Sequence, residues 1–179
     1  KEYKERKKIY LGAFDKVLSK GIYVLGGEVH AFEEEFAKYL GVKYCIGVAN
    51  GLEALQISLM ALSVGVGDEV ITTPLSAVAT TLSIMAVGAT PVFVDIKENG
   101  QLNEDLIERA ITKRTKAIIP VHLYGQPLEI EKISNICKKY KLFLIEDAAQ
   151  ALGSFWDGKH LGTFGEIGSF SFSVPKIIT

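Results

Sequence analysis

Three segments of the sequence carry residue types that suit anion binding and acid, base or nucleophilic chemistry. In the first, Asn50-Gly51 stands between a strand pattern and a helical pattern. A helix that begins there offers unpaired backbone N–H groups and the positive end of its dipole, which together suit a phosphate. A plain strand-to-helix turn, with Gly51 supplying an unusual backbone angle, would account for the same residues.

The second segment is an apolar strand pattern that ends in two adjacent carboxylates, Glu146 and Asp147. Successive side chains of a strand point to opposite faces, so only one of the two can face a ligand crevice. We assign that place to Asp147. A carboxylate that caps the following helix is the alternative, since aspartate favours such positions.

The third segment alternates serine with phenylalanine after Gly168. Period-two alternation predicts Ser169, Ser171 and Ser173 on one face of a strand, where their hydroxyl groups could reach an anion. Lys176 follows on a short loop. A single lysine is usually a solvated surface charge. Lys176, however, is expected to lie near an acid and an anion site, which favours a functional role.

The elements that must position these residues alternate along the chain. The β-branched and aromatic runs predict strands over Tyr44–Ala49, Glu69–Thr73, Pro91–Ile96, Ala117–His122, Leu142–Glu146 and Ile167–Ser173. Apolar spacing of three and four residues predicts helices over Lys4–Lys20, Val29–Leu40, Leu52–Leu62, Val78–Val87, Glu104–Ile111 and Glu129–Tyr140, with Asn103 as an N-cap. This alternation predicts an α/β fold of three layers, with helices on both faces of a mostly parallel sheet. Ligands of such sheets bind at the C-terminal strand ends, where all three segments end.

Composition narrows the functional classes. The chain has 179 residues, 48% of them hydrophobic, and a net charge of −1 from 20 basic and 21 acidic residues. Without a net basic field, nucleic-acid binding is not expected. Cys45 and Cys137 have no Cys-x-x-Cys spacing, so we expect neither a disulfide framework nor a zinc site. We expect a cytoplasmic protein without a signal peptide or a membrane span.

An anion site, an acid at a strand end, a strand of hydroxyl groups and a nearby lysine together suggest pyridoxal 5′-phosphate. This cofactor needs a phosphate cradle, an amine for its Schiff base and an acid partner for its pyridine nitrogen.

At these residues the sequence resembles the DegT/DnrJ/EryC1/StrS family of sugar aminotransferases, which have the fold of aspartate aminotransferase. The matching motifs occur in the family's order along nearly the whole chain: Gly21–Gly27, Phe32–Phe36, Asn50–Leu55, Gly88–Asp95, Val121–Gln126, Glu146–Gln150 and Ser169–Ser173 with Lys176.

The resemblance implies roles for individual residues. Lys176 would carry the cofactor as a Schiff base and move the proton during the reaction. Asp147 would keep the pyridine nitrogen protonated, so that the ring withdraws electrons. Gln150 would hydrogen-bond the ring oxygen of the cofactor. The dehydratase branch of the family has histidine in place of the lysine, so Lys176 favours transamination.

The phosphate site implied by the resemblance consists of the Ser171 hydroxyl and the backbone N–H groups of Gly51 and Leu52. One departure from the family concerns the aromatic residue that often stacks on the cofactor ring. The matching position here is Ala77, so stacking must be weaker or come from elsewhere.

The implied reaction transfers an amino group from an amino acid, by family habit glutamate, to a nucleotide-linked keto sugar. Such reactions serve amino-sugar and cell-surface polysaccharide biosynthesis. Family members are longer homodimers, so we expect residues 1–179 to be the N-terminal part and large cofactor domain without the small C-terminal domain, and to be inactive by themselves. The motifs do not distinguish a 3-keto from a 4-keto sugar.

Three other interpretations of these residues are considered. A non-catalytic regulatory or scaffold protein could use the same fold, with Lys176 incidental. A hydrolase could use Ser169, His122 and Asp147, but the sequence has no Gly-x-Ser-x-Gly elbow. A metal could bind His30 and its neighbouring glutamates, yet no third ligand is near, so we expect a solvated helix face and no metal.

Overall fold

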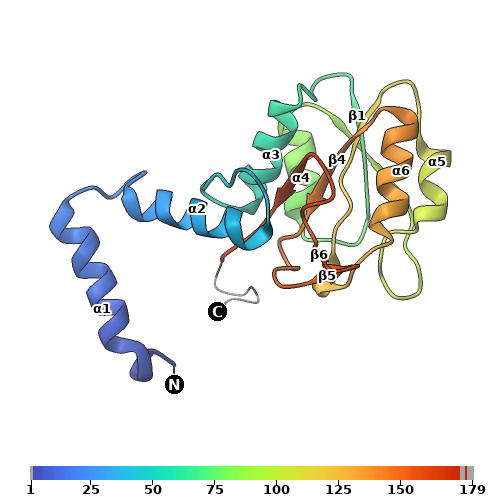
Figure 1. Ribbon diagram of the computed structural model, residues 1–179. Coiled ribbons are helices and arrows are strands. Elements are labelled where there is room, and N and C mark those ends of the chain that lie inside the picture. Colours follow the sequence, from blue (N-terminus) through green and yellow to red (C-terminus); the bar gives the residue numbers. More distant parts are fainter. Residues whose placement is uncertain (1, 174–175, 177–179) are drawn as a thin grey trace. The chain divides into compact units, whose positions relative to one another are not determined.

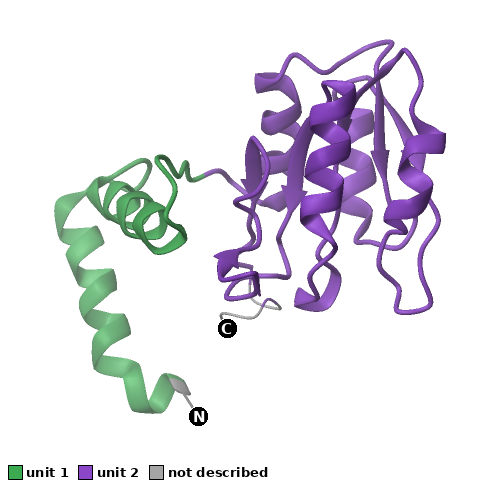
Figure 2. Ribbon diagram, turned by 45° about the vertical axis from the view of Figure 1, so that its right-hand side comes forward, with its two compact units in different colours: residues 1–47 green, residues 48–179 purple. Residues whose placement is uncertain are grey.

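The computed structural model describes residues 2–173 and residue 176 (Figure 1). The chain divides into two compact units, residues 1–47 and residues 48–179 (Figure 2). The N-terminal unit is helical, and the C-terminal unit combines helices with a parallel sheet.

The N-terminal unit consists of α1 (Glu2–Lys20) and α2 (Gly27–Leu40), which confirms both predicted helices. Glu28 at the start of α2 forms ion pairs with Lys16 and Lys20, with 3.0 Å between each lysine Nζ and a carboxylate oxygen. The helix α2 ends at Leu40 and is capped by Gly41, whose φ of 70° is the left-handed conformation that glycine adopts without strain.

The predicted strand over Tyr44–Ala49 is wrong. These residues have no regular structure, and the side chains of Tyr44 and Ile46 are 72% and 77% exposed. A strand forms only where a neighbouring strand accepts its hydrogen bonds, and none of the described strands pairs with this segment. The β-branched and aromatic residues of this segment are therefore not sufficient to form a strand without a neighbour to pair with.

A five-stranded sheet forms the centre of the second unit, in the order β2-β1-β3-β4-β7. All four pairings between neighbouring strands are parallel, as predicted. The strands are β1 (Glu69–Thr72), β2 (Thr90–Phe93), β3 (Thr115–Ile118), β4 (Phe143–Asp147) and β7 (Ile167–Ser169). The strand order changes direction between β1 and β3, because the chain passes from β1 to β2 on one side and then returns to β3 on the other. Sheets of this kind bind ligands at the C-terminal strand ends beside such a point.

Helices cover both faces of the sheet, so the fold has the three layers that the sequence predicts (Figure 1). The helices are α3 (Gly51–Ala61), α4 (Val78–Ala86), α5 (Ile107–Ala110) and α6 (Ile130–Tyr140), and the 3₁₀ turns are η1 (Glu104–Leu106) and η2 (Leu123–Gly125). A short antiparallel hairpin joins β5 (Phe155–Trp156) to β6 (Lys159–His160).

The core is split by the sheet into two clusters. Ile118 and Leu144 point toward α5 and α6, while Ile119 and Ile145, one residue further along, pack with α3 and α4. All four side chains are at most 2% exposed. Burial on both faces explains why the strands are almost continuously apolar in the sequence.

Several predicted elements are shorter than expected. The strands predicted over Pro91–Ile96 and Ala117–His122 end earlier and are Thr90–Phe93 and Thr115–Ile118. The predicted helix over Glu104–Ile111 is a 3₁₀ turn followed by one α-helical turn, with Asn103 as the N-cap that accepts the N–H of Asp105. The predicted strand over Ile167–Ser173 ends at Ser169. The sheet neighbour of this strand, β4, ends at Asp147, which pairs with Ser169, so no pairing partner continues alongside the later residues.

Candidate functional site

The carboxylate of Asp147 is buried at the C-terminal end of β4, with 6% of the residue exposed. Its Oδ2 accepts a hydrogen bond of 2.8 Å from the hydroxyl of Thr80, near the start of α4. Its Oδ1 accepts one of 3.2 Å from the N–H of Ala149. Both contacts come from donors, so they suit the ionised carboxylate.

A second hydroxyl extends this contact outward. The Oγ of Ser76 lies 2.8 Å from Oγ1 of Thr80. The single hydroxyl proton of Thr80 goes to Asp147, so Ser76 must be the donor to Thr80. Sequence reasoning missed Thr80, because no pattern along the chain indicates that this hydroxyl meets Asp147, 67 residues further on.

Burial raises the pKa of Asp147 above its ordinary value, and the hydrogen bonds from Thr80 and Ala149 oppose this change. The positive charge of Lys176 also lowers the pKa of Asp147. Lys176 is half-buried, and its backbone N–H donates to the carbonyl oxygen of Ser173 at 2.9 Å. The structure thus brings the lysine and the acid of the sequence analysis to the same end of the sheet, within electrostatic reach of each other.

Glu146 points away from Asp147, as alternation predicts, and its contacts stabilise the fold. It is fully buried, and its Oε2 lies 2.9 Å from Nε2 of His122. The same carboxylate accepts backbone N–H groups at 2.8 Å from Gly162, 2.5 Å from Phe164 and 2.9 Å from Gly165. Burial alone would raise the pKa of Glu146, but the hydrogen bonds from His122, Gly162 and Gly165 hold it below its ordinary value.

The predicted anion site lies at the start of α3. The side chain of Asn50 caps this helix by accepting the N–H of Glu53 at 2.9 Å, and its carbonyl accepts the N–H of Ala54. The N–H groups of Gly51 and Leu52, the first two of the helix, have no intrahelical acceptor. The helix start predicted at Asn50-Gly51 is therefore confirmed.

Ser171 lies directly beside Gly51. A Cβ atom placed on Gly51 would stand 3.6 Å from Cβ and 4.0 Å from Oγ of Ser171. Gly51 has no positive φ, so its lack of a side chain leaves room beside Ser171 rather than relieving backbone strain. The Oγ of Ser171 lies 3.1 Å from that of Ser173, whereas buried Ser169 contacts the carbonyl oxygen of Gly51.

Gln150 lies three residues after Asp147 and is half-buried. Its Oε1 accepts the backbone N–H of Tyr124, from η2, at 3.0 Å. Ala77, the position at which the family often has an aromatic ring, is exposed as the N-cap residue of α4.

The rival sites of the sequence analysis are not assembled. His122 faces Glu146, and Ser169 faces Gly51, so these two residues do not form a nucleophile and base pair. Nδ1 of His30 lies 3.4 Å from Glu33, which also accepts the N–H of Gly47 at 2.6 Å. Glu33 therefore has a structural partner in its own unit.

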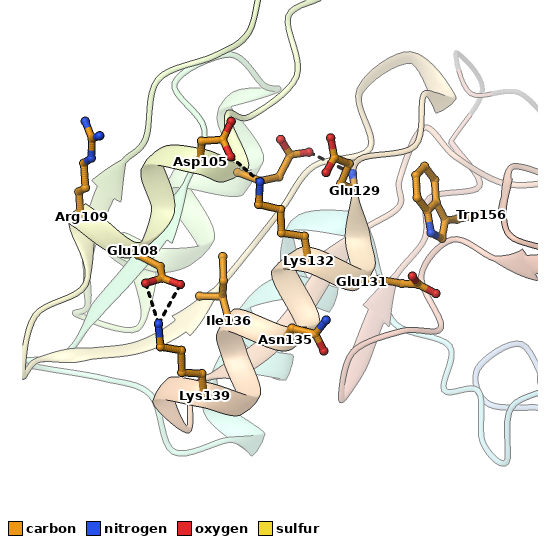
Figure 3. A pocket seen from close by; sticks show the side chains of 11 residues that line it. Asp105, Glu108, Arg109, Glu129, Glu131, Lys132, Asn135, Ile136, Lys139 and Trp156 are labelled. Atoms are coloured by element: carbon orange, nitrogen blue, oxygen red, sulfur yellow. Dashed lines mark hydrogen bonds and ion pairs between the residues drawn. The ribbon is translucent and has the colours of Figure 1, made fainter.

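A surface groove of about 930 Å³ lies elsewhere, over η1, α5 and α6 (Figure 3). Within it, Lys132 pairs with Asp105, and Lys139 pairs with Glu108 at 2.9 Å. None of the candidate site residues lines this groove. Both of its lysines are already paired with neighbouring carboxylates, so we do not take it as the reactive site. No helix in the part of the chain that the structure describes has the length and apolar character needed to cross a membrane.

Comparison with known families gives a match over residues 4–179 to the model of the DegT/DnrJ/EryC1/StrS aminotransferase family. One curated relative is a dTDP-3-amino-3,6-dideoxy-alpha-D-galactopyranose transaminase from Aneurinibacillus thermoaerophilus, 52% identical over 161 residues, which are 89% of this chain and 44% of the relative. Another, from Geobacillus stearothermophilus, is named a pleiotropic regulatory protein and is 43% identical over 98% of this chain and 47% of its own length.

Solved structures agree. The crystal structure of S. venezuelae DesV in complex with a ketimine intermediate has a TM-score of 0.94 at 40% identity, over 98% of this chain and 47% of that one. The PLP form of Spr1654 from Streptococcus pneumoniae, described as a sugar aminotransferase, has a TM-score of 0.87 at 31% identity, over 90% of this chain and 45% of that one.

The parallel sheet with an acid, a lysine and a helix start at its C-terminal edge defines a fold of the aspartate aminotransferase type. Within that class, the chain belongs to the DegT/DnrJ/EryC1/StrS aminotransferase family. It spans about half the length of the curated relatives it matches.

Proposed function

We propose that the protein carrying this chain binds pyridoxal 5′-phosphate and transfers an amino group from an amino acid to a nucleotide-linked keto sugar. Membership of the family supports this activity, as do the relatives named as transaminases of nucleotide-linked amino sugars. The observation that carries the proposal is the buried carboxylate of Asp147 at the C-terminal end of β4, which accepts hydrogen bonds at both oxygens from Thr80 and Ala149.

The residues present fit this cofactor at three points. Asp147 accepts hydrogen bonds at both oxygens and is nearly buried, which suits a carboxylate that faces a protonated pyridine nitrogen. Gly51 and Ser171 are adjacent, and a side chain at Gly51 would fill the space beside the Ser171 hydroxyl. Two backbone N–H groups at the start of α3 add the positive potential that a phosphate requires.

When bound, pyridoxal phosphate supplies the electron sink that stabilises negative charge on the substrate carbon. The residues of this chain supply binding, orientation and proton transfer. Asp147 would bind the ring nitrogen, and Gly51, Leu52 and Ser171 would bind the phosphate.

Lys176 would attach the cofactor and, once released, carry a proton between substrate and cofactor. Proton transfer to the amine requires that it be in its neutral form. Over both half-reactions, the donor amino acid becomes a 2-oxo acid and the ketone becomes an amine, so no external oxidant or reductant is needed. We propose glutamate as the donor.

An absorbance experiment on the full-length protein tests this function. Addition of pyridoxal phosphate should give the visible band of a lysine-bound cofactor, and borohydride should fix it to the peptide that contains Lys176. Lys176→Ala should abolish the band, whereas Lys113→Ala, at an exposed turn, should leave it unchanged. Glutamate consumption with a panel of 3-keto and 4-keto nucleotide sugars would then identify the acceptor. A wild-type protein without the band would refute the proposal.

We propose further that the full-length protein is a cytoplasmic homodimer. The helix α1 exposes the large apolar side chains of Ile9 and Phe14, at 69% and 67%, which need a covering surface. The two cysteines are unpaired thiols, which suits a reducing compartment. Light scattering during size-exclusion chromatography measures the number of subunits.

A regulatory function is the second candidate, because one relative is named a pleiotropic regulatory protein. Under this alternative, the protein would bind the cofactor or its relatives without turnover. The discriminating result is a lysine-bound cofactor that glutamate does not convert to its amine form.

A further inference from the structure

A glutamine outside the proposed catalytic group, Gln101, is almost fully buried, with 3% exposed. It stands between β2 and η1, in a turn in which its backbone carbonyl accepts the N–H of Lys97 at 2.7 Å. Its own N–H donates to the side chain of Asn99 at 3.1 Å. These bonds fix the backbone from which the Gln101 side chain extends.

The Gln101 side chain supports the backbone of η2. Its Nε2 donates a buried hydrogen bond of 3.0 Å to the carbonyl oxygen of Leu123. Its Oε1 is buried without a hydrogen-bond partner among the described residues. Burying this oxygen without a partner costs free energy of folding, because the oxygen loses its hydrogen bonds to water. A side chain placed only to fill space would not need this amide.

The next residue, Tyr124, has a left-handed backbone with φ 57° and ψ 22°, which is unfavourable for a bulky residue. Its side chain is 73% exposed, so burial of the ring does not explain the conformation. The backbone does have a contact here, since the Tyr124 N–H donates to Oε1 of Gln150 at 3.0 Å.

This contact determines which end of the Gln150 amide a ligand meets. A carboxamide has one acceptor oxygen and one donor NH₂ group. Because the Tyr124 N–H engages the oxygen, the NH₂ group is the end that remains for a ligand. A ring oxygen that carries negative charge requires a donor of this kind.

We propose that Gln101 is a positioning residue of the cofactor site, because it holds the Leu123–Gly125 turn whose Tyr124 N–H orients the NH₂ group of Gln150 toward the cofactor ring oxygen. The inference rests on the proposed function for its ligand. The hydrogen bonds from Gln101 to Leu123 and from Tyr124 to Gln150 belong to the chain itself.

Two variants of the full-length protein test the two parts of this arrangement, the support of the turn by Gln101 and the NH₂ group of Gln150. Gln101→Met keeps the length and volume of the side chain but removes the donor to Leu123. Gln150→Glu keeps an acceptor for Tyr124 but removes the NH₂ group. Glu98→Gln, an exposed change in the same turn as Gln101, is the matched control. Circular dichroism establishes that each variant is folded.

The first readout is the pKa of the nitrogen that joins the lysine to the cofactor, from the pH dependence of the visible band. A donor to the ring oxygen makes that oxygen a poorer acceptor for the proton on this nitrogen, so loss of the donor raises the pKa. We expect an increase of about one pH unit in Gln101→Met, the size expected for one hydrogen bond to a charged group, and a larger increase in Gln150→Glu, because its carboxylate also adds a negative charge beside the ring oxygen. Glu98→Gln should match the wild type.

The second readout needs no cofactor. Hydrogen exchange of the Tyr124 amide should be slow in the wild type and in Glu98→Gln, and at least about tenfold faster in Gln101→Met. A wild-type pKa together with wild-type exchange in Gln101→Met would overturn the inference while the proposed function stands. Absence of the visible band from the wild type would overturn the proposed function and, with it, the role of Gln101 toward a cofactor.

Discussion

Replacing Glu146 with glutamine should strongly destabilise the fold without changing the shape of the side chain. The carboxylate is fully buried and has four hydrogen-bond partners. His122 and the N–H of Gly162 share one oxygen, and the N–H groups of Phe164 and Gly165 share the other. Whichever oxygen becomes an NH₂ group, two partners lose their acceptor.

The size of the effect follows from these contacts. A hydrogen bond to a buried charged group contributes about 1.5–3 kcal/mol, and the substitution removes one or two such bonds while placing an NH₂ group against N–H donors. The imidazole of His122 can change tautomer and accept from the new NH₂ group, which would recover one contact but not the one to Gly162. We therefore expect Glu146→Gln to lower the free energy of unfolding by about 3–5 kcal/mol.

Urea unfolding of the full-length protein, followed by far-ultraviolet circular dichroism, measures this change. The control is Glu131→Gln, an exposed position on α6, which should lie within about 0.5 kcal/mol of the wild type. Because the Glu146 contacts fix the loop from Gly162 to Gly165 just before β7, the variant should also bind pyridoxal phosphate more weakly. A loss of less than about 1 kcal/mol would refute the account of Glu146 as the anchor of this loop.

Three further predictions concern the same part of the fold. Since the folded-state pKa of Glu146 lies below 4.5, its stabilising contribution is present above pH 4.5 and is lost as pH falls through the folded-state pKa; urea midpoints in acid should show this loss in the wild type and not in Glu146→Gln. Thr80→Val removes the donor to Asp147 and should cost about 1–3 kcal/mol in the same unfolding assay, whereas Thr80→Ser should restore most of it. Gly165→Ala would place a Cβ atom 2.2 Å from the carbonyl oxygen of Leu144, so thermal unfolding should reveal a loss of more than about 3 kcal/mol or no folded protein; wild-type stability would contradict the packing described.

Local pattern was sufficient for the elements whose residues are buried on both sides. The apolar runs that became β1, β3 and β4 are nearly continuous in the sequence because helices cover both faces of the sheet. The hairpin of β5 and β6 was not among the predicted elements; its turn residues Asp157 and Gly158 have the positive φ, of 45° and 75°, that tight hairpin turns require. The same kind of pattern gave a wrong strand at Tyr44–Ala49, because no described strand pairs with it.

The amino-acid sequence by itself determined the alternation of strands and helices, the cap at Asn103 and the opposite directions of Glu146 and Asp147, since these depend on neighbours along the chain. Only the tertiary structure decided that Thr80 donates to Asp147 and that Gln101 supports the turn beside Gln150. Such contacts join segments that are distant in sequence. No sequence pattern identifies the partner of a single hydroxyl or amide group, so its role is decided only when the sheet brings the strand ends together.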